Sequence, residues 1–174
     1  MGVEIERKFL LAGDGWRAFA QRSERIAQGY LVSAAAIHAG HAKCSVRVRI
    51  SGDQAWLNIK SATLGIQRHE FEYPVPLADA EHLLHELSDG MLEKIRHHVM
   101  FEGTHFEIDE FLGDNAGLIV AEVELTSTDA TYPKPDWLGA EVSKSSRYYN
   151  VNLIDRPYAR WSAAEREGKE DASC

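Results

Sequence analysis

Glu4-Ile5-Glu6-Arg7-Lys8, close to the N-terminus, is the stretch that decides the fold. Side chains on a β-strand alternate between two faces, so Glu4, Glu6 and Lys8 share one face. Two carboxylates at i and i+2 lie roughly 6.6 Å apart, and at an effective dielectric constant near 20 they repel each other by about 2–3 kcal/mol. Such a pair is either screened by water on a solvated strand face or used to hold a cation.

The same sorting of charge recurs along the chain, in segments that alternate between apolar and charged residues as half-buried strands do. Carboxylates come in pairs two residues apart: Glu4/Glu6, Glu70/Glu72, Glu107/Asp109 and Glu122/Glu124. Basic residues do the same at Arg47/Arg49 and Lys94/Arg96, with Lys8 and Lys60 as single residues. A solvated face normally mixes several polar residue types. The grouping of carboxylates and basic residues on separate strands therefore favours a ligand-binding site over a solvated surface.

The alternating segments predict eight short strands joined by turns, as in an antiparallel barrel or sandwich. We expect strands over residues 3–10, 26–33, 43–51, 54–61, 67–73, 91–101, 104–111 and 118–125. Apolar spacing predicts helices at residues 14–22, 77–88 and 145–154, and a short one around Trp137. Residues 34–42 are expected to form a loop, and the tail from about Ala163 is expected to be disordered.

Periodicity alone leaves open which face of the strands is inside. A lipocalin-like barrel would be apolar within and charged outside, whereas a barrel with a charged lumen needs helices over its apolar outer face. The predicted helices at 14–22 and 77–88 carry apolar stripes that need a surface, which favours the charged lumen. We therefore predict a mainly β (α+β) fold, an eight-stranded antiparallel β-barrel in one domain of residues 1–155, followed by a tail of residues 156–174.

Composition excludes several classes of function. The formal net charge of −8 over 174 residues argues against a nucleic-acid partner. No apolar run is long enough to cross a membrane, and the N-terminus is charged where a signal peptide would be apolar. Two cysteines are too few for a disulfide framework, and no Cys/His spacing indicates a zinc site. A cytoplasmic protein is expected, and a homodimer is left open.

A lumen lined by both carboxylates and basic groups has one natural class of ligand. Carboxylate oxygens bind hard cations such as Mg²⁺ or Mn²⁺, and Arg and Lys side chains bind phosphate oxygens. A metal ion and several bases around one cavity indicate a small polyphosphate as the substrate. No P-loop or dinucleotide fingerprint is present, so side chains must hold the phosphates.

Glu4-Ile5-Glu6-Arg7-Lys8 resembles the E-x-E-x-K motif of the CYTH domain, the triphosphate tunnel metalloenzymes. Later blocks resemble those of the family in order: Arg47-Val48-Arg49, Asn58-Ile59-Lys60, Glu70-Phe71-Glu72, Glu93-Lys94-Ile95-Arg96, Ile108-Asp109-Glu110-Phe111, Glu122-Val123-Glu124-Leu125 and Arg147-Tyr148-Tyr149-Asn150. The likeness runs from Val3 to about Leu153 and is closest to the short bacterial inorganic triphosphatases. The chain departs from the family at Ser143-Lys144-Ser145, where Thr and acidic residues are usual, which leaves the form of a C-terminal plug open.

The resemblance implies divalent-metal-dependent hydrolysis of a terminal phosphoanhydride inside a charged tunnel. It implies metal ligands among Glu4, Glu6, Glu122 and Glu124, with Asp109, Glu70 and Glu72 nearby. The phosphate-binding residues would be Arg47, Arg49, Lys60, Lys94 and Arg96. A catalytic dyad of Lys8 and Tyr30 is implied as well, and these two residues would meet if the first two strands pair.

Other functions stay open on the same fold. The substrate would be thiamine triphosphate, a nucleoside triphosphate or ATP for cyclisation, or the protein would be a non-catalytic polyphosphate or nucleotide sensor. The expected Lys8–Tyr30 dyad favours hydrolysis, because sensing needs no base. His98 and Glu107 are left open as rim charges, and His105 is expected to be a surface or packing residue. Removing Glu122 or Glu124 is expected to leave the metal-free protein no less stable, because like charges are separated.

Overall fold

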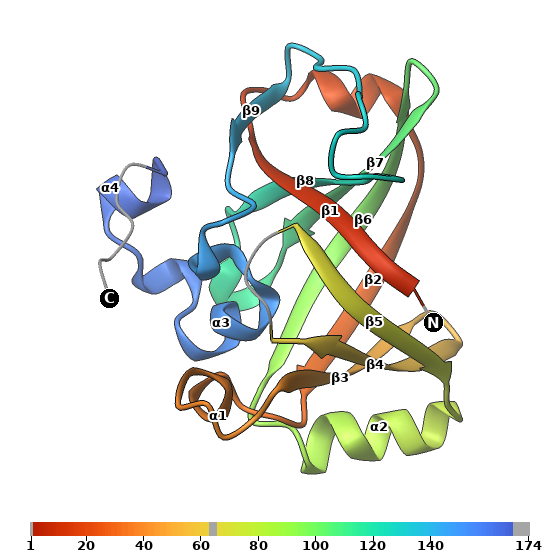
Figure 1. The fold of residues 1–174 in the computed structure, drawn as a ribbon, viewed down its shortest axis with the longest axis vertical. Helices are drawn as coiled ribbons and strands as arrows, with labels where there is room; N and C mark the ends of the chain where they lie inside the picture. The colour runs from red at the N-terminus through yellow and green to blue at the C-terminus, as the bar shows by residue number, and fades with distance from the viewer. Residues whose placement is uncertain (1, 63–65, 169–174) are drawn as a thin grey trace.

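The computed structural model describes residues 2–62 and 66–168 (Figure 1). Its strands, all paired antiparallel, are β1 (Gly2–Leu11), β2 (Ala20–Tyr30), β3 (Cys44–Ser51), β4 (Gln54–Ser61), β5 (Gln67–Pro74), β6 (Met91–Phe101), β7 (Thr104–Phe111), β8 (Ile119–Glu124) and β9 (Leu138–Glu141). The α-helices are α1 (Ala34–His38), α2 (Leu77–Glu86), α3 (Asn150–Asp155) and α4 (Ala163–Arg166). Single 3₁₀ turns are η1 (Gly15–Phe19), η2 (Gly113–Asn115), η3 (Ser146–Tyr148) and η4 (Tyr158–Arg160).

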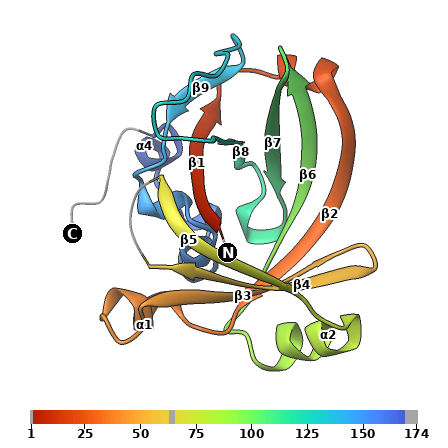
Figure 2. The same cartoon turned by 45° about the vertical axis from the view of Figure 1, so that its right-hand side comes forward.

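Eight strands close into a barrel, which confirms the predicted fold class. The order around the barrel is β5-β4-β3-β2-β6-β7-β8-β1, and β1 returns to β5 through pairs from Gly2↔Glu70 to Ile5↔Gln67. One edge of β1 pairs with β8. The other edge pairs with β5 along the first half of the strand and with β9 at Phe9 and Leu11. Figure 2 shows β5 beside the N-terminal end of β1 and β9 near its other end.

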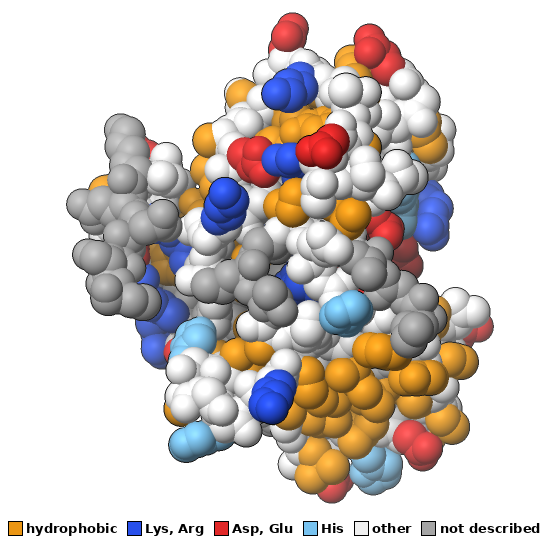
Figure 3. Space-filling model, viewed as in Figure 1, with side chains coloured by type: hydrophobic (Ala, Val, Ile, Leu, Met, Phe, Trp, Pro, Cys, Tyr) orange, Lys and Arg blue, Asp and Glu red, His pale blue; other side chains and the backbone are white. Residues whose placement is uncertain are grey.

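The apolar faces of the strands point outward and are covered by packed elements. Helix α2 covers Val48 and Ala55 with its buried residues Ala80 and Leu84. A second cluster joins η1 and the segment before β9 to the barrel wall, through Trp16, Trp137, Phe9, Phe106 and their neighbours. Apolar side chains also gather over the region of β3–β5 and α2 on the face shown in Figure 3. These covers exclude the lipocalin-like alternative and leave the charged faces inside.

Several predicted elements differ from the structure, among them the helix expected at 145–154, which is the turn η3 followed by the short helix α3. The helix expected at 14–22 is only the turn η1, because β6 pairs with β2 as far as Ala20↔Val99 and draws this segment into a strand. Residues 34–38 form α1 where a loop was predicted, since the Ser33 hydroxyl caps it by accepting a hydrogen bond from the Ala36 N–H at 3.1 Å. The segment around Trp137 leads into β9, because β1 offers it a free edge.

The C-terminal segment is ordered further than expected. Trp161 is buried against Tyr148 and Leu153, and α4 begins with a capping box between Ser162 and Glu165. Residues 163–168 therefore have a defined structure, in which Glu165 is buried, and 169–174 lie outside the described part of the chain. The division into a domain of 1–155 and a tail stays a prediction. No helix of the described residues has the length and hydropathy to cross a bilayer.

Candidate active site

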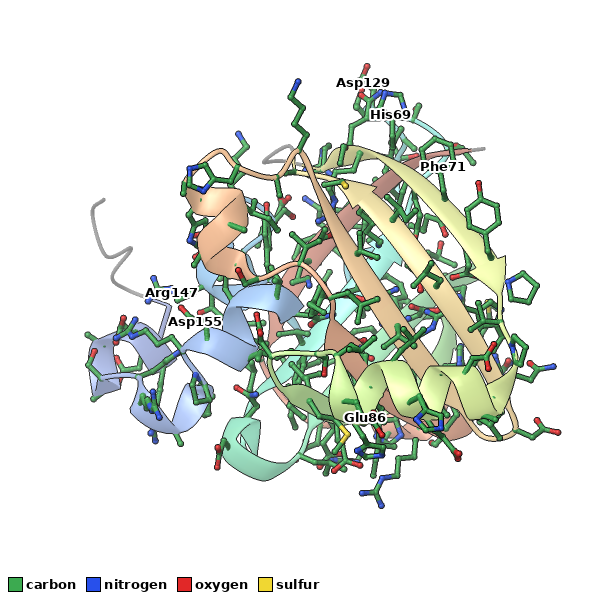
Figure 4. All side chains as sticks on the ribbon, turned by 90° about the horizontal axis from the view of Figure 1, so that it is seen from below. His69, Phe71, Glu86, Asp129, Arg147 and Asp155 are labelled. Carbon is green, nitrogen blue, oxygen red and sulfur yellow. The ribbon has the colours of Figure 1, made fainter. Side chains whose placement is uncertain are left out.

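A cavity of about 240 Å³ occupies the barrel lumen. It is lined by all of the predicted site residues except Asp109: Glu4, Glu6, Lys8, Tyr30, Arg47, Arg49, Lys60, Glu70, Glu72, Lys94, Arg96, Glu122 and Glu124. Their side chains face inward because β-strand parity places every second residue on one face. Outward neighbours lie on the other side, as Figure 4 shows for His69 and Phe71 at the periphery of the molecule.

Carboxylates from β1, β5 and β8 crowd one side of the cavity. Burial, with the charges of Glu122 and Glu4 added, raises the pKa of Glu6 from 4.5 to about 7. Burial and the charges of Glu4, Glu107 and Glu70 raise the pKa of Glu124 as well. Raised pKa values show that these groups have too little positive charge around them for all to be ionised. A group of oxygen donors short of positive charge fits a hard divalent cation.

Basic and amide groups that face the cavity from β2 and β3 have too few negatively charged or hydrogen-bonding partners. No carboxylate of the described residues lies within ion-pair distance of Arg47, which is buried, and its Nε atom has no hydrogen-bond partner. Burial and the neighbouring Arg47 lower the pKa of Arg49, whose only carboxylate partner in the described chain is Glu72 at 2.9 Å. Gln28 is fully buried, and neither polar atom of its side chain is partnered. Unpaired donors of this kind fit an anion with several oxygen atoms.

A buried ion network joins the two sides. Glu122 accepts hydrogen bonds from Lys8 Nζ at 2.6 Å and from Arg96 at 2.8 Å. Although burial opposes ionisation, Lys8 and Arg96 hold the pKa of Glu122 well below its usual range. Asp109 is fully buried and accepts from Arg96 with both oxygens at 2.7 Å and from Lys94. Glu122 and Asp109 are thus counter-ions of basic residues in this structure.

Two expectations change with this network. Asp109 does not line the cavity, because it is fully buried beneath its ion-pair partners Lys94 and Arg96, which do line it. The structure argues against the expectation that the protein tolerates loss of Glu122, because Lys8 would lose its ion-pair partner and Arg96 one of its three carboxylates. The expectation is retained for Glu124, which is exposed and repelled by neighbouring carboxylates.

Lys8 and Tyr30 both face the lumen, but β1 and β2 are not neighbours in the barrel. The premise that the first two strands pair is wrong, and no hydrogen bond links the two side chains in this structure. Lys8 Nζ instead contacts Glu122 and the Tyr148 carbonyl oxygen at 3.4 Å. Burial lowers the pKa of Lys8, but Glu122 and Glu6 outweigh it and raise the value, so Lys8 is held charged.

Several cavity residues were not singled out from the sequence. Arg68 Nη2 lies 3.8 Å from Glu6 and 3.9 Å from Glu4, and its guanidinium group stacks 5.5 Å from the Tyr149 ring. Arg68 shares the face of Glu70 and Glu72, and Gln28 shares the face of Tyr30, so strand parity was the signal for both. Tyr149 and Asn150 reach the cavity from the start of α3, which only the folded chain brings there.

Ser143, where the sequence departs from the family pattern, forms hydrogen bonds to β1 and to Glu141. Its hydroxyl accepts a hydrogen bond from the Lys8 backbone N–H at 2.9 Å and donates one to Glu141 at 2.8 Å. The Val142 N–H donates to the Lys8 carbonyl oxygen at 2.8 Å. Ser143 therefore ties β1 to the segment that leads into α3, and it continues the edge that β9 begins.

Comparison with known proteins gives consistent matches. The model of the CYTH domain family matches residues 2–158. The inorganic triphosphatase of Acetivibrio thermocellus is 42% identical over 159 residues, covering 91% of this chain and 97% of that protein. That of Nitrosomonas europaea is 32% identical over 156 residues, covering 87% and 96%. The solved structure of the inorganic triphosphatase NE1496 superposes with a TM-score of 0.61 at 31% identity, covering 88% of this chain and 95% of that one.

Proposed function

This chain belongs to the CYTH domain family, and from that premise we propose that it hydrolyses inorganic triphosphate to pyrophosphate and phosphate with the help of a divalent cation. The observation that carries the proposal is the division of the cavity. Carboxylates short of positive charge face it from β1 and β8, and the guanidinium group of Arg47, without an ion pair in the described chain, faces it from β3. A triphosphate chelated to a cation supplies both missing charges.

We infer that Mg²⁺ or Mn²⁺ is the cation. The residues that would hold it are Glu4, Glu6 and Glu124, with Glu70, Glu72, Glu122 and Asp109 as further predicted ligands. When bound, the cation neutralises charge on the phosphate oxygens. Glu122 and Asp109 would first have to give up part of their contacts with Lys8, Lys94 and Arg96. Glu4 would likewise have to release Lys60, which donates to both of its oxygens at 2.8 Å, so we expect Glu6 and Glu124 to contribute most to metal affinity.

The basic side chains would bind and orient the substrate. Arg47 and Arg49 can each offer two parallel N–H donors to a phosphate group, and Gln28 adds an amide donor beside them. Lys60, Lys94 and Arg96 add positive charge around the same cavity. Held in this way, the terminal phosphoryl group keeps one orientation toward an attacking water molecule, which is the main contribution that positioning makes to phosphoryl transfer.

Tyr30 is our proposed proton-handling residue, and Lys8 supplies a positive charge to the same cavity. Tyr30 is buried at the cavity wall, and its phenolate can accept the proton of the attacking water, or its phenol can relay that proton while passing on its own. Lys8 is charged, so it would act by stabilising developing negative charge rather than as a neutral base. The alternative is that Tyr30 only packs at the cavity wall and that the cation activates the attacking water. In that case Tyr30→Phe should have the same kcat as the wild type.

The cavity favours an inorganic substrate over a nucleotide. Trp56, the aromatic residue that shares the charged face of β4, does not line the cavity, and the Arg49 guanidinium group lies 5.0 Å from the centre of its ring. The Arg49 guanidinium group thus covers one face of the ring, and the ring lies outside the cavity. A cytoplasmic location stays a prediction, and a homodimer remains open.

A phosphate-release panel tests the proposal. Tripolyphosphate, ATP, thiamine triphosphate and pyrophosphate are each supplied with Mg²⁺ and with Mn²⁺, and kcat/KM is measured. We expect tripolyphosphate to give the highest value and pyrophosphate to be left intact. A higher value for ATP or thiamine triphosphate would reassign the substrate, and formation of a cyclic nucleotide would make the protein a cyclase. Binding without turnover of any of the four would make it a sensor.

A further inference from the structure

Two imidazoles and a carboxylate meet at one end of the β6–β7 hairpin. His98 Nδ1 lies 3.0 Å from His105 Nε2, with the two rings stacked 8° from parallel. Glu107 Oε1 lies 4.0 Å from the same His98 Nδ1 atom. One ligand atom from each of the three residues lies within 4.8 Å of the others. The β6–β7 register creates this group, because His98 is the cross-strand partner of Glu107 and His105 precedes it by two residues.

The distances are close to those of a metal site. Zinc binds His nitrogen at about 2.0–2.1 Å, so two nitrogens on a tetrahedral ion lie about 3.3 Å apart. The 3.0 Å between His98 and His105 therefore needs only a small opening. The 4.0 Å to Glu107 needs a small approach. No rearrangement of a strand is required, because all three side chains already share the lumen face of β6 and β7.

The surrounding residues orient the three groups as ligands. Glu24 accepts a hydrogen bond from His98 Nε2 at 2.6 Å, and an ionised carboxylate can only accept, so in a neutral His98 the Nδ1 atom keeps its lone pair. His105 Nε2 is then the donor of the 3.0 Å hydrogen bond to His98 Nδ1, and metal binding would move that proton to His105 Nδ1. The Ser51 hydroxyl donates to the other oxygen of Glu24 at 2.5 Å and fixes that carboxylate. Arg96 holds Glu107 through Oε2, which leaves Oε1 directed to the histidines. A histidine that binds a metal ion usually donates its other ring N–H to a carboxylate in this way, as His98 does to Glu24.

We propose that His98, His105 and Glu107 form a second cation site, specific for a transition-metal ion such as Zn²⁺ and separate in chemistry from the all-carboxylate site. Imidazole nitrogen selects zinc-like ions, whereas carboxylate oxygens alone select Mg²⁺ and Mn²⁺. Three protein ligands leave a fourth position open. His105 and Glu107 line the lumen cavity, so that position faces the space in which a phosphate oxygen would lie. The site stands on these three residues and does not depend on the proposed function.

The test is calorimetric titration of the untagged, full-length protein with Zn²⁺ in the presence of excess Mg²⁺, which occupies the carboxylates. We expect one Zn²⁺ per chain for the wild type. His105→Gln removes an exposed ligand without emptying the core and should weaken this affinity by at least roughly 10-fold. His69→Gln is the matched control, since His69 is exposed on the outer side of β5, and should bind like the wild type (Figure 4).

Glu24→Gln separates a supporting role from ligation. It leaves the three ligands in place but weakens the acceptor that orients His98, so we expect about 10-fold to 100-fold weaker Zn²⁺ binding with the stoichiometry unchanged. Unfolding midpoints measured without metal confirm that each variant folds. Equal affinity in His105→Gln and the wild type, or complete loss of the Zn²⁺ signal to Mg²⁺ competition, would overturn the proposal. The histidine pair would then be a hydrogen-bonded support of the barrel wall.

Discussion

Glu6→Gln should make the metal-free protein more stable at neutral and alkaline pH. Glu6 has a side chain only about 17% exposed, and its pKa is raised from 4.5 to about 7 by burial and by the charges of Glu122 and Glu4, against the opposing effect of Lys8 and Lys60. The glutamine keeps the size and the hydrogen-bonding oxygen of the side chain and removes the charge. Only the electrostatic cost is therefore altered.

The size of the effect follows from proton linkage. Between pH 4.5 and about 7 the folded protein keeps a proton on Glu6 that the unfolded chain has lost, so the free energy of unfolding falls as pH rises across this window. A shift of 7 − 4.5 = 2.5 pKa units at 1.36 kcal/mol each gives a cost of about 3 kcal/mol above pH 7. Since some solvent reaches Glu6, this is an upper value, and we expect a gain of about 2–3 kcal/mol at pH 8 and almost none at pH 4.5.

Urea unfolding in excess chelator, at pH 4.5 and pH 8, measures the difference. Added Mg²⁺ should reverse it, because a ligand at 100 times its dissociation constant stabilises the wild type by about 2.7 kcal/mol and the variant by less. Glu86→Gln on α2 is the control, with a side chain 68% exposed, and should change stability little at either pH (Figure 4). Equal stability of Glu6→Gln and wild type at pH 8 would refute the electrostatic account of the site.

Three further variants test the remaining roles. Asp109→Asn should lower the free energy of unfolding by about 3–5 kcal/mol in urea titrations, because Lys94 and Arg96 lose a buried counter-ion; a stable variant with impaired metal binding would instead make Asp109 a ligand. Arg47→Gln should reduce kcat/KM for tripolyphosphate by about 10-fold to 100-fold, since a charge-assisted hydrogen bond contributes about 1.5–3 kcal/mol, and should leave the unfolding midpoint unchanged because no ion pair is lost. Tyr30→Phe should lower kcat by about 10²–10⁴-fold with substrate affinity retained, and an unchanged kcat–pH profile would remove Tyr30 from the proton route.

Strand parity carried most of the site from the sequence. Alternation fixed the face of Glu4, Glu6, Arg47 and Glu124 correctly, because the period of a strand is two wherever it lies in a sheet. Parity also places Gln28 on the inner face. Only the structure shows that its buried amide has no hydrogen-bond partner in the described residues. The apolar stripes of the predicted helices at 14–22 and 77–88 then indicated that the charged face lies inside.

What parity cannot supply is which strands are neighbours and how deep a residue lies. Lys8 and Tyr30 face the same lumen, but β1 and β2 are separated in the barrel order, so the expected contact does not form. Asp109 faces inward by parity, yet its opposition to Arg96 across β6 and β7 buries it as a counter-ion. Residues 138–141 become a strand because β1 has an unfilled edge there, which is a property of the closed barrel.

The divided edge of β1 sets an order of events during synthesis. β1 is synthesised before the other strands, and several of its partners come more than a hundred residues later. These pairs are Glu6 with Glu124, Phe9 with Glu141, and the Lys8 N–H with Ser143. At about 5–20 residues per second, the partners follow it by roughly 6–27 s. Until β8 has been made, the N-terminal strand has only β5 to pair with, and contacts so far apart in sequence form slowly. During that interval, charge repulsion between the Glu4 and Glu6 carboxylates of two chains would oppose pairing of the chains through this strand.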